Sequence, residues 1–225
     1  MLAWSAIRCV LFDLDGTLVD TAPDMVAALN RLRQSEGLPP MATELLRNQV
    51  SHGAIGLLAA GMPATDADTH ERWRLNFLEL YEQNLCVNSR LFPGMAKVLD
   101  VIQAGNRSCG VVTNKPGWLA RPLLETLGLS ARLSCLVPGD ALKRKKPHPD
   151  PILRACELTG ASPLESIYVG DAERDVQAAR AANCPSVVAR YGYIDQNERP
   201  ELWGADAMID SANQLADLLL STPCG

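Results

Sequence analysis

Asp13 and Asp15 stand two residues apart, directly after the short apolar run Arg8–Phe12. Two carboxylates at the end of a buried strand can bind a divalent cation, or one can act as nucleophile while the other exchanges a proton. A calcium loop of the EF-hand type would place Gly at its sixth position and Glu at its twelfth. Counted from Asp13, those positions hold Leu18 and Asp24, so a calcium loop is excluded. The pair therefore indicates a catalytic or metal-binding site.

Four further polar residues complement this pair. Thr113 and Asn114 follow one apolar run, Asp171 follows another, and Lys146 precedes a proline in the segment between them. They add a hydroxyl, an amide, a carboxylate and a cation. Such a set can hold a divalent metal and a phosphoryl group in one place.

Other charges near these segments have simpler interpretations. Lys143 and Lys145 are expected to be solvated loop residues. Asp175 stands one helical turn after the last apolar run, where it either orients the metal ligands or forms an ion pair with Arg174 or Arg180. Both interpretations of Asp175 stay open at this point.

The elements that position these residues alternate between strands and helices. Short apolar runs predict strands at Arg8–Phe12, Ser108–Val112, Ser134–Val137, Ser166–Val169 and Ser186–Ala189. Helical stretches lie between them at Pro116–Leu127, Pro149–Thr159 and Arg174–Ala182. This alternation predicts right-handed βαβ units and an α/β fold with a mainly parallel sheet.

The region from about Thr21 to Asn88 breaks that alternation, because it shows helical patterning and no clear strand. Thr21 is predicted as the N-cap of its first helix. A later helix, 66–85, carries an aromatic stripe that we interpret as core packing. An all-helical insert after the first strand predicts a lid over the carboxyl edge of the sheet. His52 lies between two of its helices, where a loop facing the substrate is expected.

Bulk composition excludes several classes of protein. The 225 residues are 47% hydrophobic and carry a formal net charge of -5, which gives no reason to expect nucleic acid or an anionic membrane as partner. The seven cysteines include no close pair of the C-x-x-C type, so neither a disulfide framework nor a zinc knuckle is expected. Cys9 and Cys109 are predicted to be buried. No signal peptide or membrane-spanning run is recognisable, which predicts a cytoplasmic protein.

The segments around Asp13, Thr113, Lys146 and Asp171 resemble, in order, motifs one to four of the haloacid dehalogenase (HAD) superfamily. The resemblance covers nearly the whole chain. It implies an α/β, Rossmann-like HAD core with a parallel sheet, plus a small all-helical cap domain inserted after the first strand. The core would comprise residues 1–18 and 91–225, and the cap residues 19–90.

The resemblance also implies a role for each motif residue. Asp13 would become a phospho-aspartate, and Asp15 would protonate the leaving alcohol and then activate water. Mg²⁺ would be held by Asp13, the main-chain oxygen of Asp15 and Asp171. Thr113 and Asn114 would bind the phosphoryl oxygens, and Lys146 would add a fixed positive charge. An acid at position 15 favours phosphoester chemistry over carbon–halogen cleavage.

Within the superfamily, the chain resembles the phosphoglycolate phosphatases, which implies a Mg²⁺-dependent phosphomonoesterase acting on a small phosphorylated metabolite. Short segments such as Trp203-Gly204-Ala205-Asp206 also resemble the N-acetylmuramic acid 6-phosphate phosphatases of cell-wall recycling. A sugar-phosphate mutase and a non-catalytic interaction protein are the remaining alternatives. Candidate substrate-binding residues in the cap are cations for a carboxylate, or polar groups for a sugar: Arg47, His52, Arg72 and Arg74, or Asn48, Gln49 and Ser51.

Overall fold

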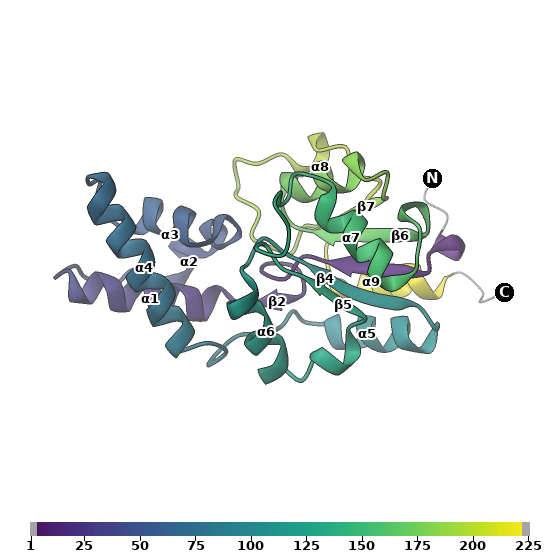
Figure 1. Cartoon of the computed structure of the whole chain (residues 1–225), viewed down its shortest axis with the longest axis horizontal. Helices are drawn as coiled ribbons and strands as arrows, with labels where there is room; N and C mark the ends of the chain where they lie inside the picture. The colour runs from purple at the N-terminus through teal and green to yellow at the C-terminus, as the bar shows by residue number, and fades with distance from the viewer. Residues whose placement is uncertain (1–3, 222–225) are drawn as a thin grey trace.

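A six-stranded, entirely parallel sheet lies at the centre of the larger part of the molecule (Figure 1). The structure is a computed structural model, and it describes residues 4–221. The strand order is β5-β4-β1-β6-β7-β8. The strands are β1 (Cys9–Phe12), β4 (Ser108–Val112), β5 (Cys135–Val137), β6 (Ser166–Gly170), β7 (Ser186–Ala189) and β8 (Ala207–Ile209). The five predicted strands are confirmed to within one residue at each end, and β8 is an addition.

The register of the three central strands brings their carboxyl ends level. Phe12 of β1 pairs with Val111 of β4 on one side and with Val169 of β6 on the other. Directly beyond, Asp13 donates its main-chain N–H to Val169 O at 2.9 Å. Residues that follow β1, β4 and β6 therefore meet at one edge of the sheet, as ligand sites of parallel sheets do.

Helices cover both faces of this sheet. They are α5 (Met95–Ala104), α6 (Gly117–Thr126), α7 (Asp150–Thr159), α8 (Glu173–Ala181) and α9 (Ala212–Leu220), joined by the short 3-10 turns η1 (Trp4–Ala6), η3 (Ser130–Arg132), η4 (Pro163–Glu165) and η5 (Pro200–Leu202). The predicted helices α6, α7 and α8 are confirmed to within one residue at each end.

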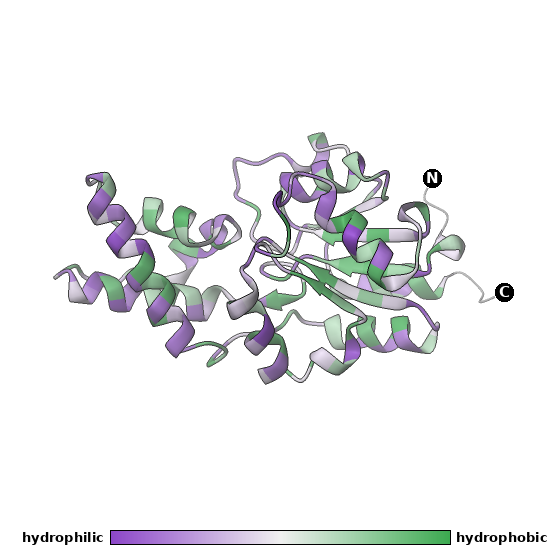
Figure 2. Ribbon diagram, in the orientation of Figure 1, coloured by the Kyte–Doolittle hydropathy of each residue, from purple (hydrophilic) through white to green (hydrophobic). Residues whose placement is uncertain are grey.

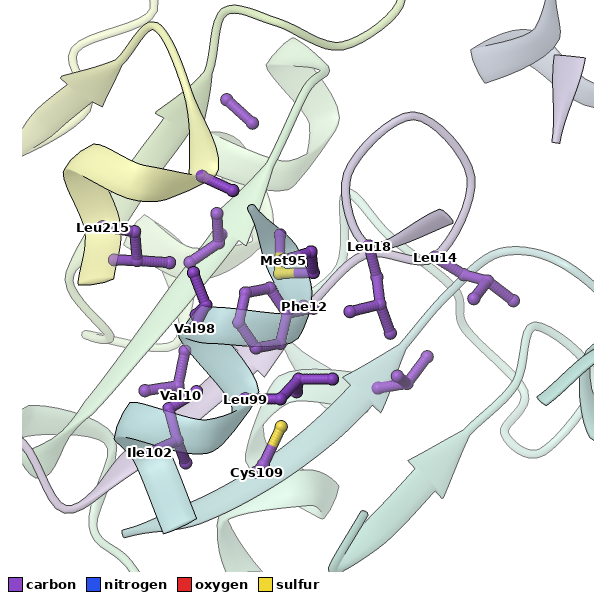
Figure 3. Close-up of a cluster of buried hydrophobic side chains, with 14 of the residues drawn as sticks. Val10, Phe12, Leu14, Leu18, Met95, Val98, Leu99, Ile102, Cys109 and Leu215 are labelled. Atoms are coloured by element: carbon purple, nitrogen blue, oxygen red, sulfur yellow. The ribbon is translucent and has the colours of Figure 1, made fainter. Parts of the chain in front are cut away.

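Strand β1 is buried on both faces, which explains why its sequence is apolar without alternation. Val10 and Phe12 belong to one cluster with residues of α5 and α9 such as Leu99 and Leu215 (Figure 3). Cys9 belongs to a second cluster with residues of α7 and α8. The colouring of Figure 2 shows hydrophobic residues on the central strands and on parts of the helices.

The cysteines behave as small apolar residues. Cys9 and Cys109 are buried, as predicted, and burial raises the pKa of both thiols, that of Cys9 to about 11. The six cysteines in the described part of the chain are all free, while Cys224 lies outside the described residues.

A separate group of helices lies to one side of the sheet (Figure 1). It comprises α1 (Ala22–Ser35), α2 (Thr43–Leu46), the 3-10 turn η2 (Arg47–His52), α3 (Gly53–Gly61) and α4 (Ala67–Gln83). Trp73, Phe77 and Tyr81 of α4 are buried in an apolar cluster formed mainly by these helices, so the aromatic stripe is core packing, as predicted. We call residues 22–83 the helical insert.

Two short antiparallel strands mark the ends of the helical insert: β2 (Val19–Asp20) pairs with β3 (Arg90–Leu91). Asp24 strengthens this junction, because its carboxylate accepts hydrogen bonds from the main-chain N–H groups of Asn88 and Ser89 and from the Ser89 hydroxyl. The division into a core of residues 1–18 and 91–225 and a cap of residues 19–90 stays a prediction. No helix within residues 4–221 combines the length and the apolar character that crossing a membrane requires.

Candidate active site

A cavity of about 600 Å³ lies between the carboxyl edge of the sheet and the helical insert. Asp13, Asp15, Thr113 and Asn114 line it from the core. The insert contributes the segment 50–55 at the start of α3, Met25 of α1, and Arg74, Phe77, Leu78 and Tyr81 of α4. A concave site that combines apolar walls with a few convergent charged groups is the usual form of a small-molecule site.

Asp13 is almost fully buried at this edge, and one of its oxygens is held firmly. Oδ1 accepts the main-chain N–H of Leu14 at 2.7 Å and lies 3.0 Å from the Lys146 ammonium. Lys146 is itself buried and is fixed by the Asp175 carboxylate at 2.8 Å and by the Tyr168 hydroxyl at 2.8 Å. The cation beside Asp13 therefore has a single position.

Three buried carboxylates gather here: Asp13, Asp171 and Asp175 each offer an oxygen within 4.8 Å of the others. Burial, followed by the charges of Asp13 and Asp175, raises the pKa of Asp171 to about 7. The cations near these three acids in the described part of the chain are the buried Lys146 and the half-buried Arg174, so the acids outnumber the cations. Oxygen ligands with excess negative charge fit a hard divalent cation such as Mg²⁺.

The structure answers only the ion-pair part of the question about Asp175, so a role of Asp175 in orienting metal ligands stays a prediction. Asp175 belongs to the carboxylate cluster, and its ion-pair partner is Lys146. An ion pair was one of the two interpretations, but the partners expected for it, Arg174 and Arg180, are wrong. Arg174 donates to the main-chain oxygen of Ser51, and Arg180 donates to the main-chain oxygens of Trp203 and Gly204. The side chain of Asp15 lies outside the cluster, so the proposed metal contact through its main-chain oxygen stays a prediction.

Asp15 accepts two hydrogen bonds on Oδ1, from the Thr21 hydroxyl at 2.6 Å and from the Lys115 ammonium at 3.0 Å. Thr21 occupies the predicted N-cap position of α1, but its hydroxyl serves Asp15 and makes no side-chain cap. Burial alone would lower the pKa of Lys115, yet the neighbouring Asp15 carboxylate and Tyr81 oxygen raise it above its usual value. Lys115 is therefore charged.

The residues after β4 face the cavity in different ways. The Thr113 hydroxyl accepts the main-chain N–H of Lys115 at 3.2 Å and keeps its own hydrogen to donate. The Asn114 side chain is engaged on both atoms by the main chain of Lys146, which donates its N–H to Oδ1 and accepts from Nδ2. Asn114 thus positions the lysine, and the expected contact of Asn114 with the phosphoryl oxygens stays a prediction.

Glycine is required at position 16, where the segment after β1 passes close to Asp171. Gly16 has φ +85°, and a Cβ there would overlap the Asp171 carboxylate and the ring of Tyr193. The close approach of the two strand ends therefore depends on the missing side chain.

The insert reaches into the carboxylate cluster through one residue. The Ser51 hydroxyl donates to Asp171 Oδ2 at 2.7 Å, and the guanidinium of Arg174 donates to Ser51 O at 2.7 Å. His52 and Arg74 line the cavity, with Arg74 also paired to Glu71.

The four other candidates from the insert lie outside the cavity. Arg47 is paired with Asp20 at 2.8 Å and lies over the ring of Tyr193, and Arg72 is paired with Glu36 at 2.7 Å. Neither arginine lines the cavity, and the same is true of Asn48 and Gln49. Of the polar set suggested for a sugar, Ser51 alone lines it.

Sequence reasoning missed Lys115, Tyr81 and Tyr193. Tyr193 accepts main-chain hydrogen bonds from Thr21 and Ala22 on its hydroxyl and donates its main-chain N–H to Asp171 Oδ2. Lys115 directly follows Thr113-Asn114, and that adjacency was the available signal. Tyr193 comes from a loop after β7, and its position depends on tertiary packing alone.

The chain is similar to known phosphatases over nearly its whole length. The N-acetylmuramic acid 6-phosphate phosphatase of Pseudomonas putida is 40% identical over 97% of this chain and 99% of its own length. The phosphoglycolate phosphatase of Xylella fastidiosa is 41% identical over 93% of this chain and 91% of its own. The crystal structure of a predicted phosphoglycolate phosphatase from Haemophilus somnus matches with a TM-score of 0.84 at 30% identity, covering 97% and 99% of the two chains.

The family model described as haloacid dehalogenase-like hydrolase matches residues 10–189, a span that contains the four motif segments and the whole helical insert. The chain belongs to the haloacid dehalogenase-like hydrolases.

Proposed function

We propose that this protein is a Mg²⁺-dependent phosphomonoesterase that forms an aspartyl-phosphate on Asp13. The observation that carries the proposal is the position of Asp13 in the cavity, held by Lys146 at 3.0 Å and beside two more buried carboxylates. Nucleophile, fixed cation and acidic cluster are the parts that phosphoryl transfer to a carboxylate needs. The substrate is a small phosphorylated metabolite, and the protein acts in the cytoplasm.

In the first step the Asp13 carboxylate attacks phosphorus, and the bond from phosphorus to the ester oxygen breaks. Asp15 gives its proton to the leaving alcohol oxygen. The Thr113 hydroxyl and the Lys146 ammonium stabilise negative charge on the transferring oxygens. The products of this step are the free alcohol and the acyl phosphate on Asp13.

In the second step Asp15 accepts a proton from water as the water oxygen attacks phosphorus. The bond from phosphorus to the Asp13 oxygen breaks, and inorganic phosphate leaves. Asp15 thus begins the cycle as an acid and ends it protonated again, so the two steps balance.

Mg²⁺ would be held by Asp13, the main-chain oxygen of Asp15 and Asp171, with Asp175 beside them. It would supply positive charge that neutralises the transferring phosphoryl group. Asp175 is the fixed partner of Lys146, so it orients the site whether or not it reaches the ion.

Two substrates follow from the named relatives, 2-phosphoglycolate and N-acetylmuramic acid 6-phosphate, and both carry a carboxylate in addition to the phosphate. Arg74 and His52 are our candidate cations for that carboxylate. The cavity of about 600 Å³ favours the larger ester, because pockets of about 300–1,000 Å³ hold ligands of drug size. Its apolar wall of Met25, Leu78 and Leu119 would contact the acetyl and lactyl groups.

The test is phosphate release from both esters and several sugar phosphates with Mg²⁺ present. A kcat/KM for the muramic acid ester at least about tenfold above that for 2-phosphoglycolate supports the larger substrate. The reverse order assigns the phosphoglycolate activity. Isomerised sugar phosphate without free phosphate would identify a mutase and contradict the proposal.

A further inference from the structure

A buried ammonium group joins the candidate acid of the core to the helical insert. The Nζ atom of Lys115 lies 3.0 Å from Asp15 Oδ1, 3.0 Å from the Tyr81 hydroxyl and 4.6 Å from the centroid of the Tyr81 ring. Lys115 is 7% exposed and Tyr81 0%. Because a buried cation needs partners that replace water, the position of this ammonium depends on both residues.

The two contacts come from different parts of the molecule. Lys115 follows β4 in the core, whereas Tyr81 belongs to the last turn of α4 in the insert. Tyr81 also packs in the apolar cluster that lies mainly within the insert, with its ring stacked on Phe77 at a centroid distance of 6.3 Å. The Tyr81 hydroxyl is therefore a rigid point of the insert that touches a residue of the catalytic edge.

Both side-chain hydrogen bonds of Asp15 are accepted by the same carboxyl oxygen. Oδ1 accepts from both Thr21 and Lys115, and within residues 4–221 no hydrogen bond to Oδ2 is formed. Two donors on one oxygen fix the rotation of the carboxyl group, and they leave the other oxygen to exchange a proton in the cavity that Asp15 lines.

We propose that Lys115 and Tyr81 are positioning residues for proton transfer: Tyr81 of the insert holds the Lys115 ammonium, which holds the Asp15 carboxyl group so that Oδ2 faces the leaving group. This inference rests on the proposed function, since it assigns how that function's acid is aligned. It also makes correct placement of the acid depend on contact between insert and core.

The basicity of the leaving group distinguishes a lysine that aligns the acid from one that binds the phosphoryl group or serves only in packing. An alkyl phosphate expels a strongly basic alkoxide that needs the proton of Asp15, whereas p-nitrophenyl phosphate expels a weakly basic phenolate that leaves without one. For both esters, kcat/KM reports the steps up to release of the alcohol or phenol. A lysine that bound the phosphoryl group, or one needed only for packing, would affect the two esters equally.

The experiment compares Lys115→Met with the wild-type full-length protein in the presence of Mg²⁺. The substrates are the best alkyl ester of the panel and p-nitrophenyl phosphate. We expect kcat/KM for the alkyl ester to fall at least about tenfold more than kcat/KM for the aryl ester, in the same direction as Asp15→Asn. Equal losses for both esters, or no loss for the alkyl ester, would overturn the proposal.

Tyr81→Phe provides the milder test, because it keeps the aromatic ring and removes only the hydroxyl that contacts Lys115. It should show the same selective loss at smaller size, and an unselective change would contradict the role of the insert. Lys143→Met, an exposed lysine outside the cavity, is the matched control and should leave both values unchanged. A failure of the proposed function would appear in the wild type itself, as absence of phosphate release from either ester.

Discussion

The carboxyl edge of the sheet and the helical insert form the two sides of one cavity, but their polar groups are held in different ways. At the edge, Asp13, Lys146 and Asp175 are buried and bonded to one another at 3.0 Å and 2.8 Å. On the insert side, Arg74 and His52 are more exposed, and Arg74 pairs with a surface glutamate. Buried groups with fixed positions, such as those at the edge, suit the phosphoryl-transfer chemistry that all substrates share. More exposed side chains, such as those of the insert, suit the recognition of one particular substrate.

The largest effect should come from the edge. Asp13→Asn keeps the shape of the side chain but cannot form the acyl phosphate, so kcat/KM should fall by about 10³-fold or more. The free energy of unfolding should change little, and a thermal melt of the variant checks this. Retained turnover in the folded variant with Mg²⁺ present would remove Asp13 as nucleophile.

Mg²⁺ binding and pH should both change the stability of the protein through Asp171 at this edge. The metal-free folded protein holds a proton on Asp171 up to about pH 7, while the unfolded chain releases it near its ordinary value of 3.8. Because the folded state then binds more protons, its stability should fall as pH rises through that window. Mg²⁺ has to displace this proton, so it should stabilise the protein more at pH 8 than at pH 5.5.

Thermal melts with Mg²⁺ or EDTA at the two pH values measure this difference. EDTA should also stop turnover, and added Mg²⁺ should restore it. A stabilisation by Mg²⁺ that is equal at pH 5.5 and pH 8 would contradict the assignment of Asp171 as a ligand.

Arg74 of the insert should affect recognition more than chemistry. Arg74→Met should raise KM for a carboxylate-bearing phosphate ester by about tenfold, the value of one charge-assisted hydrogen bond, and leave kcat within about twofold. KM for an alkyl phosphate without a carboxylate should not change. Arg72→Met, on the same helix but outside the cavity, is the control. A loss of kcat in Arg74→Met would place this arginine with the catalytic groups.

The smallest effect should come from the contact that Ser51 makes between the two sides. Ser51→Ala removes the hydrogen bond to Asp171 Oδ2, one of two that this oxygen accepts. The remaining bond from Tyr193 keeps the carboxylate in place, so kcat/KM should fall by less than about tenfold. A fall as large as that of Asp13→Asn would mean that Ser51 takes part in the chemistry itself.

Sequence reasoning located the edge and its elements well because their signals are local. Strand β1 is apolar throughout since it is buried on both faces, and Asp13 follows it directly. The three residues AMI of β8 gave no such signal, since only one of them is buried. Parallel pairing brings the carboxyl ends of separate strands together. The positions of Asp13, Thr113 and Asp171 directly after predicted strands were therefore enough to predict that these residues lie close to one another.

The insert was harder to predict residue by residue. Its helices follow from periodicity, but which residues reach the cavity depends on how α1, α3 and α4 pack. Arg47 stands in the same loop as Ser51 and His52, yet it pairs with Asp20 and stays outside the cavity. Likewise, nothing in the local pattern shows that Lys115 contacts Tyr81, 34 residues away in the sequence.

The most direct test of the central claim is to trap the covalent intermediate. Acid quench during turnover of a radiolabelled phosphate ester, followed by peptide mapping, identifies the residue that carries the phosphoryl group. We predict label on the peptide that contains Asp13, and none in the Asp13→Asn variant. Label on another residue, or rapid turnover with no labelled peptide under conditions that preserve acyl phosphates, would contradict the account.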